Sequence, residues 1–238
     1  MKIALIGYGK MGKAIEQIAL QRGHEIVLKV GVENLEDNTI ENIRKADVAI
    51  EFTGPESAFE NLIRILDAGV PVVCGSTGWL AHYEEVKSHC LSKKGTLLYA
   101  SNFSVGVNIF FALNKRLAEL MAPHPGYEVT LTEVHHTEKR DAPSGTAITL
   151  AEQILAKNNQ KKQWVNHPSA IPSDLVIISD RIDPAPGTHV ITYTSGIDDI
   201  EIKHTAHNRQ GFATGAVLAA EYLLHKKGIF TMSDVLGI

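Results

Sequence analysis

The sequence predicts an α/β protein whose first half forms a parallel sheet and whose second half adds an α+β region with a mixed sheet. Three observations lead to this expectation. A glycine-rich turn at residues 7–12 follows the first apolar run. Apolar runs then alternate with amphipathic stretches up to residue 100, as in a parallel sheet covered by helices on both faces. Beyond residue 128, β-branched stretches separated by turn residues predominate, which is typical of a mixed or antiparallel sheet.

The first element is a short apolar run at residues 1–6, followed by the motif Gly7-x-Gly9-x-x-Gly12 and an amphipathic stretch at 13–21. A strand, a glycine turn and a helix are the context in which this motif binds a dinucleotide. Gly7 would permit the tight turn, Gly9 would let the backbone approach a pyrophosphate, and Gly12 would let helix and strand pack closely. Because glycine turns open many α/β units, the motif alone leaves a purely structural role equally open. The candidate cofactor contacts here are Gly7, Tyr8, Gly9, Lys10, Met11 and Gly12.

The next elements continue the alternation. Strands are expected at 25–30, 47–52, 70–75 and 96–100, and helices at 56–69 and 80–93. Ligands of such sheets bind beyond the carboxyl ends of the strands, which points to Phe52-Thr53-Gly54 after the third strand and to the loops after the fourth and fifth strands. The last two loops are the candidate cofactor contacts. Simple strand-terminating turns are the alternative reading of these loops. The residues concerned are Gly75, Ser76, Thr77, Ala100, Ser101, Asn102 and Phe103.

The tip of the second strand departs from the usual dinucleotide pattern. An acidic side chain commonly holds the adenosine ribose there. In this chain Gly31 stands at the tip and Glu33 follows two residues later. Glu33 either accepts the ribose hydroxyls or is a solvated loop charge, and the sequence favours neither. No neighbouring arginine marks a 2′-phosphate site, so NADH and NADPH both remain candidate cofactors.

A strand and a helix flank the most informative loop of the chain. Residues 128–136 alternate as a strand should, and residues 144–156 have helical spacing. Pro143 and Ser144 suit a first helical turn and a cap. The positive end of this helix is therefore expected to face the end of the strand, where an anion would be stabilised.

The loop between them concentrates cationic and titratable groups. His135 and His136 close the predicted strand, and Lys139 follows in the loop. An imidazole titrates near neutral pH, whereas a lysine stays charged, so this pair is suited to proton transfer beside an acidic substrate. The nearby carboxylates are expected to orient the histidines, balance the basic residues or cap the helix rather than to act as acid and base. These are Glu133, Glu138 and Asp141.

Adjacent histidines also raise the alternative of a metal site, with His204 and His207 as further ligands. Neighbouring side chains on a strand point to opposite faces, which makes joint ligation by His135 and His136 awkward. Lys139 would repel the ion, and neither cysteine lies nearby in the sequence. We therefore expect no metal.

The string H-H-x-x-K-x-D-A-P-S-G-T-A at residues 135–147 resembles the signature of the 4-hydroxy-tetrahydrodipicolinate reductase family, also called dihydrodipicolinate reductase. The similarity covers nearly the whole chain through further segments at 7–12, 75–78, 101–108 and 208–216. The resemblance implies NAD(P)H-dependent reduction of 4-hydroxy-tetrahydrodipicolinate to tetrahydrodipicolinate, with loss of water, in lysine and diaminopimelate biosynthesis. The substrate ring carries two carboxylates, which agrees with the basic loop.

The resemblance also implies roles for individual residues. By position in the motif, His135 is similar to the proton donor and acceptor of the family, and Lys139 to its second proton donor. His136, Gly145 and Thr146 match substrate-binding positions. The helix N–H groups of Gly145 and Thr146 would bind one carboxylate of the ring.

The predicted domains are a dinucleotide-binding domain at 1–103, completed by a C-terminal helix at 212–238, and a substrate-binding and tetramerisation domain at 104–211. Strands at 175–179, 189–194 and 200–206 would complete the second sheet. The family arrangement implies a homotetramer in which these sheets join. The chain would cross between domains near 103–107 and 209–212, and these crossings are expected hinges. Arg209 and Phe212 resemble positions near the nicotinamide, with an ion pair and a core aromatic as the alternative roles.

Composition sets the remaining expectations. A chain of 238 residues with 44% hydrophobic content can bury a substantial core, and its formal charge of -4 offers no basic field for a nucleic acid. Cys74 and Cys90 lack metal-ligand spacing and are not expected to form a disulfide. We find no signal sequence or membrane-spanning run and expect a cytoplasmic enzyme. Two alternatives remain: another two-domain NAD(P)-dependent dehydrogenase, or a non-catalytic redox sensor that binds dinucleotide.

Overall fold

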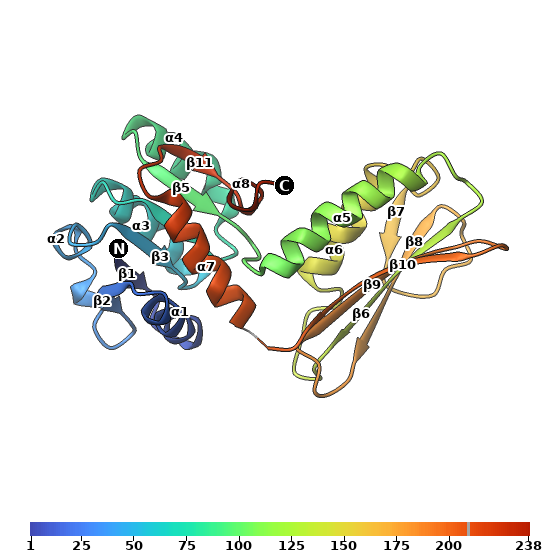
Figure 1. The fold of residues 1–238 in the computed structure, drawn as a ribbon, viewed down its shortest axis with the longest axis horizontal. Coiled ribbons are helices and arrows are strands. Elements are labelled where there is room, and N and C mark those ends of the chain that lie inside the picture. The colour runs from blue at the N-terminus through green and yellow to red at the C-terminus, as the bar shows by residue number, and fades with distance from the viewer. Residues whose placement is uncertain (209) are drawn as a thin grey trace. The chain divides into compact units, whose positions relative to one another are not determined.

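The computed structural model describes residues 1–208 and 210–238, which form two compact units. The first unit combines Met1–Val105 with Gln210–Ile238, and the second begins at Gly106 and takes the described residues up to 208. Figure 1 shows the elements of each unit. Arg209, one of the residues expected near the cofactor, lies outside the described residues.

The first unit is built on a parallel sheet in the order β11-β5-β4-β3-β1-β2. β2 and β3 lie on opposite sides of β1, and this reversal of strand order leaves a crevice at the carboxyl ends of the strands. The predicted α/β fold with a dinucleotide-binding type of sheet is confirmed. The strands are β1 (Lys2–Ile6), β2 (Glu25–Val30), β3 (Val48–Glu51), β4 (Val72–Cys74), β5 (Thr96–Tyr99) and β11 (Gly228–Phe230).

Helices cover both faces of this sheet because successive strand residues point to opposite sides. Ala4 and Ile6 of β1 share a core with α2 (Ile40–Ile43), α3 (Pro55–Asp67) and α4 (Tyr83–Ser92). Ile3 and Leu5 share the other core with α1 (Lys10–Gln21), α7 (Gln210–Leu223) and α8 (Met232–Leu236). Short 3-10 turns precede α2 and α4, at Leu35–Asp37 and Leu80–His82.

Several boundaries differ from those expected. α1 begins at Lys10 rather than at residue 13, because the helix starts directly after Gly9. The C-terminal stretch is not one helix: α7 ends at Leu223, and β11 and α8 follow it. β11 pairs with β5 through three residues and extends the sheet at its edge. Such short elements carry little periodicity, which is why the sequence pattern did not indicate them.

The second unit is built on a mixed sheet in the order β10-β9-β6-β8-β7. β6 pairs antiparallel with β9 and parallel with β8. The helices α5 (Val105–Met121) and α6 (Gly145–Leu155) pack on one face of this sheet. The strands are β6 (Glu128–His135), β7 (Gln163–Val165), β8 (Asp174–Arg181), β9 (Gly187–Thr194) and β10 (Asp199–Ala206).

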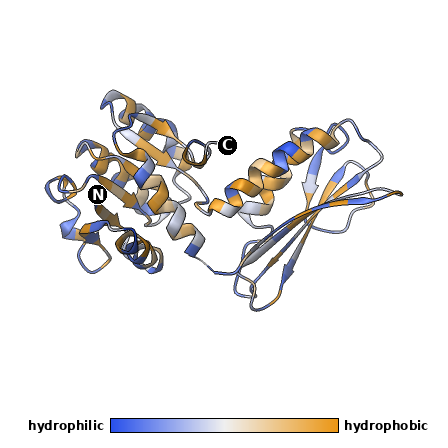
Figure 2. Cartoon of the chain, viewed as in Figure 1, coloured by the Kyte–Doolittle hydropathy of each residue, from blue (hydrophilic) through white to orange (hydrophobic). Residues whose placement is uncertain are grey.

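α5 was not predicted, although its spacing indicates a helix. Its buried positions recur at intervals of three and four residues, which is the period of one helix face. Hydrophobic and hydrophilic residues alternate along α5 in Figure 2, in agreement with a helix that buries one side. Those buried residues are Val107, Phe110, Asn114, Ala118 and Met121.

Two further features concern the cysteines and the helices of the described residues. Cys74 and Cys90 are both buried and free, so no disulfide joins them. Among the described residues, no helix combines the length and the apolar character needed to cross a bilayer.

Candidate functional site

The glycine motif has the geometry that a dinucleotide site requires. A Cβ atom on Gly7, whose φ is +100°, would lie 2.1 Å from the carbonyl oxygen of Phe52. A Cβ on Gly12 would lie 2.3 Å from the carbonyl oxygen of Gly7, so both positions exclude a side chain. By contrast, a Cβ on Gly9 would meet nothing within 4 Å. The position beside the backbone at Gly9 is therefore open.

A cavity of about 370 Å³ lies beside this motif, within the first unit. It extends from the glycine turn to the loops that follow β2 and β3. Of the predicted contacts, Gly7, Tyr8 and Gly9 line it, whereas Glu33 is exposed and lies outside its lining. The full lining is Ile6, Gly7, Tyr8, Gly9, Val30, Gly31, Val32, Leu35, Asn38, Phe52, Thr53, Gly54, Glu56, Ser57 and Asn61.

The remaining predicted cofactor residues are not part of the cavity lining. Lys10, Met11 and Gly12 form the first turn of α1. The two groups 75–77 and 100–103 follow β4 and β5 at the carboxyl end of the sheet but do not line the cavity. The sequence also pointed to the loop after β3, and its residues Phe52, Thr53 and Gly54 line the cavity. Glu56, Ser57 and Asn61 of α3 line it as well and were not among the candidates.

A buried carboxylate organises two of these loops. Glu51, the last residue of β3, is fully buried. It accepts hydrogen bonds from the hydroxyl of Ser76 at 3.0 Å, from the backbone N–H of Thr53 at 3.1 Å and from the Thr53 hydroxyl. The thiol of Cys74 donates to it at 3.2 Å. Glu51 thereby ties the loop after β3 to the loop after β4. Burial, followed by the charge of Glu51, raises the pKa of Cys74 well above its usual value.

A second buried carboxylate, Glu133 on β6, organises the site of the second unit. Strand register places Ser179 of β8 and His189 of β9 directly beside it on its two sides. The Ser179 hydroxyl donates to Oε1 of Glu133 at 2.7 Å, and the backbone N–H of Ser144 donates at 3.0 Å. Nη2 of Arg181 lies 3.3 Å from the same oxygen. One carboxylate therefore joins β6, β8 and the start of α6.

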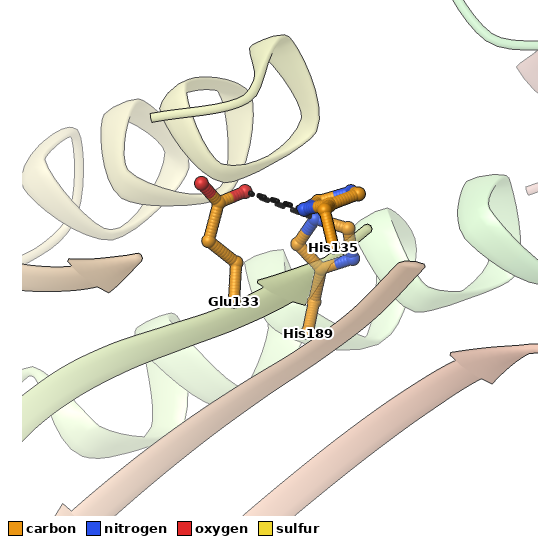
Figure 3. A group of neighbouring side chains, drawn as sticks. All are labelled: Glu133, His135 and His189. Carbon is orange, nitrogen blue, oxygen red and sulfur yellow. Dashed lines mark ion pairs between the residues drawn. The ribbon is translucent and has the colours of Figure 1, made fainter. Parts of the chain in front are cut away.

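Two imidazoles turn toward the same carboxylate, as Figure 3 shows. Nδ1 of His135 lies 3.3 Å from Oε2 of Glu133, within ion-pair distance but without hydrogen-bond geometry. Nε2 of His189 lies 3.7 Å from that oxygen. The two rings meet edge to face with centroids 5.2 Å apart. A Cβ at Gly187 would lie 3.1 Å from Nε2 of His135, so glycine at this position leaves that edge of the ring uncrowded.

The surroundings set the charge of these groups. Burial raises the pKa of Glu133, but His135 and the two serine donors lower it by more, so that this pKa lies well below its usual value. Burial and the charge of His135 lower the pKa of His189 to about 4. Near neutral pH the cluster therefore holds an ionised carboxylate and a neutral His189.

Three groups of this cluster have the composition of a metal site, since donor atoms of Glu133, His135 and His189 lie within 4.8 Å of one another. However, a guanidinium and two hydrogen-bond donors already satisfy the carboxylate. We therefore interpret the group as a hydrogen-bonded cluster. The predicted alternative ligands His204 and His207 are not part of it.

The loop after β6 carries the other predicted residues. His136 directly follows the strand, and its carbonyl accepts from the Lys139 backbone N–H at 3.1 Å. Nζ of Lys139 lies 2.7 Å from the carboxylate of Asp141, and this contact lowers the pKa of Asp141. Nη2 of Arg181 donates to the carbonyl of Asp141 at 2.6 Å, which fixes the loop to β8.

The start of α6 completes the site. Ser144 is the N-cap, and its hydroxyl accepts from the Ala147 N–H at 3.2 Å, as the sequence indicated. Pro143 precedes this cap instead of lying in the first turn. Gly145 and Thr146 form the first turn, where N–H groups have no acceptor within the helix. Two histidines, an ammonium group and this helix end thus occur within one short segment.

Comparison with known proteins identifies the family. Residues 1–103 match the family model described as dihydrodipicolinate reductase, N-terminus, and residues 106–236 match the corresponding C-terminus. The chain belongs to the dihydrodipicolinate reductase family. It is 50% identical over 239 residues to the 4-hydroxy-tetrahydrodipicolinate reductase of Christiangramia forsetii, covering 100% of this chain and 98% of that protein. It is 35% identical to the enzyme of the same name from Methanosarcina barkeri, over 87% of this chain and 78% of that protein.

Solved structures show the same fold. A dipicolinate-bound dihydrodipicolinate reductase from Paenisporosarcina sp. TG-14 has a TM-score of 0.77 at 23% identity, with 97% of each chain covered. A probable dehydrogenase from Thermotoga maritima has a TM-score of 0.62 at 10% identity, over 99% of this chain and 92% of that one. The predicted family and its reductase function in lysine and diaminopimelate biosynthesis are confirmed. As a dihydrodipicolinate reductase, the enzyme is an oxidoreductase that uses a nicotinamide dinucleotide.

Proposed function

We propose that the first unit binds NADH or NADPH and that the second unit binds 4-hydroxy-tetrahydrodipicolinate, which is reduced to tetrahydrodipicolinate with loss of water. The observation that carries the second half of this proposal is the segment anchored by Glu133. It holds His135, Lys139 and the start of α6 together through contacts to β8. The dipicolinate bound to the related reductase supports a cyclic dicarboxylate as the ligand.

Each group in the segment has a role in this proposal. The first-turn N–H groups of Gly145 and Thr146, together with His136, bind the substrate carboxylates, because a helix N-terminus stabilises an anion. Lys139 stabilises negative charge that develops at the ring nitrogen and donates a proton there. His135 is the proton donor and acceptor, and the ionised Glu133 beside it stabilises the positive charge of its protonated form.

The cofactor is assigned to the glycine motif and the adjoining cavity. When bound, NADH or NADPH supplies the hydride, which we assign to ring carbon 4 of the dehydrated substrate. The open space at Gly9 receives the pyrophosphate, and the loops after β4 and β5 complete the site. Those loops contribute Gly75, Ser76, Thr77, Ala100, Ser101, Asn102 and Phe103.

The test is an assay with substrate generated immediately before use by dihydrodipicolinate synthase. We expect oxidation of NADH or NADPH only when the synthase product is present. The oxidation is measured as the loss of absorbance of the reduced nicotinamide. Omitting the synthase gives the control for background oxidation. No oxidation with either cofactor, from a folded protein, would contradict the proposal.

We further propose a cytoplasmic homotetramer joined through the open face of the second sheet. Thr132, Ile178 and Val190 are neighbours across three strands on the face opposite α5 and α6. Ile178 is 46% exposed in the single chain, which supports burial of this face by another copy. Light scattering coupled to gel filtration is expected to give four times the 26.0 kDa chain mass, and Ile178→Lys is expected to reduce it.

A further inference from the structure

The lining of the cavity beside the glycine motif contains one charged side chain. Of the described residues that line it, only Glu56 carries a charged side chain, and the others are glycines, apolar residues or neutral polar residues. Glu56 is the second residue of α3, and its Oε2 would lie 3.1 Å from a Cβ atom on Gly54. The carboxylate therefore turns back over the start of its helix, on the wall formed by the β3–α3 loop.

The opposite wall lacks the acidic group that dinucleotide sites usually carry. The tip of β2 presents Gly31, whose N–H donates to Oδ1 of Asn34 at 2.8 Å. Glu33, two residues beyond, and Glu56 are both exposed, but only Glu56 is among the lining residues. Lys29 of β2 forms an ion pair with Glu16 across 3.1 Å, so its charge is already balanced. The carboxylate available to a ribose in this cavity is therefore that of Glu56, on the wall formed by the β3–α3 loop.

We propose that Glu56 is the residue that selects the cofactor, by accepting hydrogen bonds from the adenosine ribose hydroxyls and repelling a 2′-phosphate. An ionised carboxylate can only accept hydrogen bonds, and ribose hydroxyls can donate them. A 2′-phosphate offers only acceptors and additional negative charge. The enzyme therefore favours NADH over NADPH. This inference rests on the proposed binding of the dinucleotide in the first unit.

The position of Glu56 in the first turn of α3 also suits a purely structural role, since a carboxylate there interacts favourably with the helix dipole. The two roles differ in what they predict. A helix-stabilising carboxylate changes the thermal stability of the protein but leaves the preference between two cofactors unchanged. A carboxylate that faces the ribose changes that preference and makes it depend on ionic strength.

The test measures binding without turnover. NADH and NADPH are titrated separately into the purified full chain, and the dissociation constants are obtained from the fluorescence of the reduced nicotinamide. We expect the wild-type protein to bind NADH roughly tenfold more tightly than NADPH, and this ratio to fall as salt is added, because a screened charge pair of this kind contributes about that factor. In Glu56→Gln the ratio is expected to approach one and to become insensitive to salt.

Three further variants make the result specific. Glu56→Asp keeps the charge and is expected to retain a preference for NADH. Glu60→Gln removes an exposed charge one turn further along α3, outside the cavity, and is expected to behave as wild type. Glu33→Gln removes the exposed acid that follows the tip of β2, outside the lining, and is also expected to leave the ratio unchanged.

The possible outcomes separate this inference from the proposed function. Tight binding of both cofactors without discrimination, a preference for NADPH, or a ratio that changes in Glu33→Gln but not in Glu56→Gln would overturn the role of Glu56 and leave the reductase assignment intact. If the folded wild-type protein bound neither dinucleotide, the cofactor assignment itself would be wrong.

Discussion

The backbone N–H of Ser144 donates to the buried carboxylate of Glu133 across 3.0 Å, which fastens the N-cap of α6 to the strand that carries His135. The same carboxylate faces the imidazole of His135 at 3.3 Å. A single side chain therefore determines both where the helix N-terminus lies and which charge lies beside the proposed proton donor.

Replacing Glu133 with glutamine keeps the shape of the side chain but removes its charge. We expect turnover to fall at least about tenfold, which is less than the roughly hundredfold or larger loss expected when a general acid such as His135 is itself removed. The free energy of unfolding is expected to fall by about 2 kcal/mol, because hydrogen bonds to a buried charged group are lost or weakened. Denaturant unfolding and steady-state kinetics measure the two effects. Glu138→Gln, at an exposed position of the neighbouring loop, is the control and should show neither.

Loss of either proposed proton donor is expected to lower turnover by more than loss of Glu133 does. His135→Gln and Lys139→Ala are each expected to lower turnover at least about a hundredfold, as is typical for loss of general acid catalysis. Arg140→Ala removes a neighbouring exposed cation and serves as the control for the loss of charge in the loop. Near-normal rates in either of the first two variants would show that the proton comes from another group.

Stability in acid is expected to depend on His189. The pKa of this residue is about 4 in the folded protein and 6.5 without the protein environment, so between these values the unfolded chain binds a proton that the folded chain does not. Its contribution to stability is therefore complete above pH 6.5 and is lost as the pH falls toward 4. From pH 7 to pH 5 we expect a loss of about 2 kcal/mol from this residue.

Thermal unfolding of wild type and His189→Gln at several pH values tests this expectation. The variant should lose less stability between pH 7 and pH 5 than the wild type does. The lowered pKa of Glu133 has the same sign and adds a further loss below its unfolded value of 4.5, in both proteins. Equal slopes in wild type and variant above pH 5 would show that His189 is not the group that titrates.

Glu51 is expected to affect cofactor affinity indirectly, by holding the loops after β3 and β4 in place. Glu51→Gln replaces an acceptor of hydrogen bonds from Thr53, Ser76 and Cys74 with a group that also donates, so the loops after β3 and β4 lose part of their common anchor. We expect the dissociation constant for NADH to rise about tenfold, which corresponds to one lost hydrogen bond to a charged group. Cys74→Ala removes only the thiol contact and should change cofactor affinity by much less.

Local patterns were sufficient to predict much of the fold. The glycine motif with its flanking strand and helix, the parallel strands, and the Ser144 cap each depend on residues close together in the sequence. α5 was not predicted, although its buried positions follow a helical period. The short elements β11 and α8 offered too few residues for a period to be visible.

The partners within the two sites were harder to predict. His189 lies beside Glu133 only because β9 pairs antiparallel with β6 in a particular register, and Ser179 lies on the other side through a second pairing. Glu56 faces the cavity because the β3–α3 loop lies opposite the tip of β2. The local sequence does not determine which residues become neighbours across strands. The family motif therefore indicated the two histidines and the lysine, but not the residues that surround them.

The pairing of β6 with β9 limits where residues can be inserted into the second unit. Because side chains alternate along a strand, one residue inserted between Gly187 and His189 would turn the imidazole to the far side of the sheet. Glu133 would then keep its charge but lose that ring as a neighbour. An insertion in the turn between β9 and β10, at residues 195–198, would leave the pair intact. Designers who wish to attach a loop or a tag inside this unit should therefore use that turn.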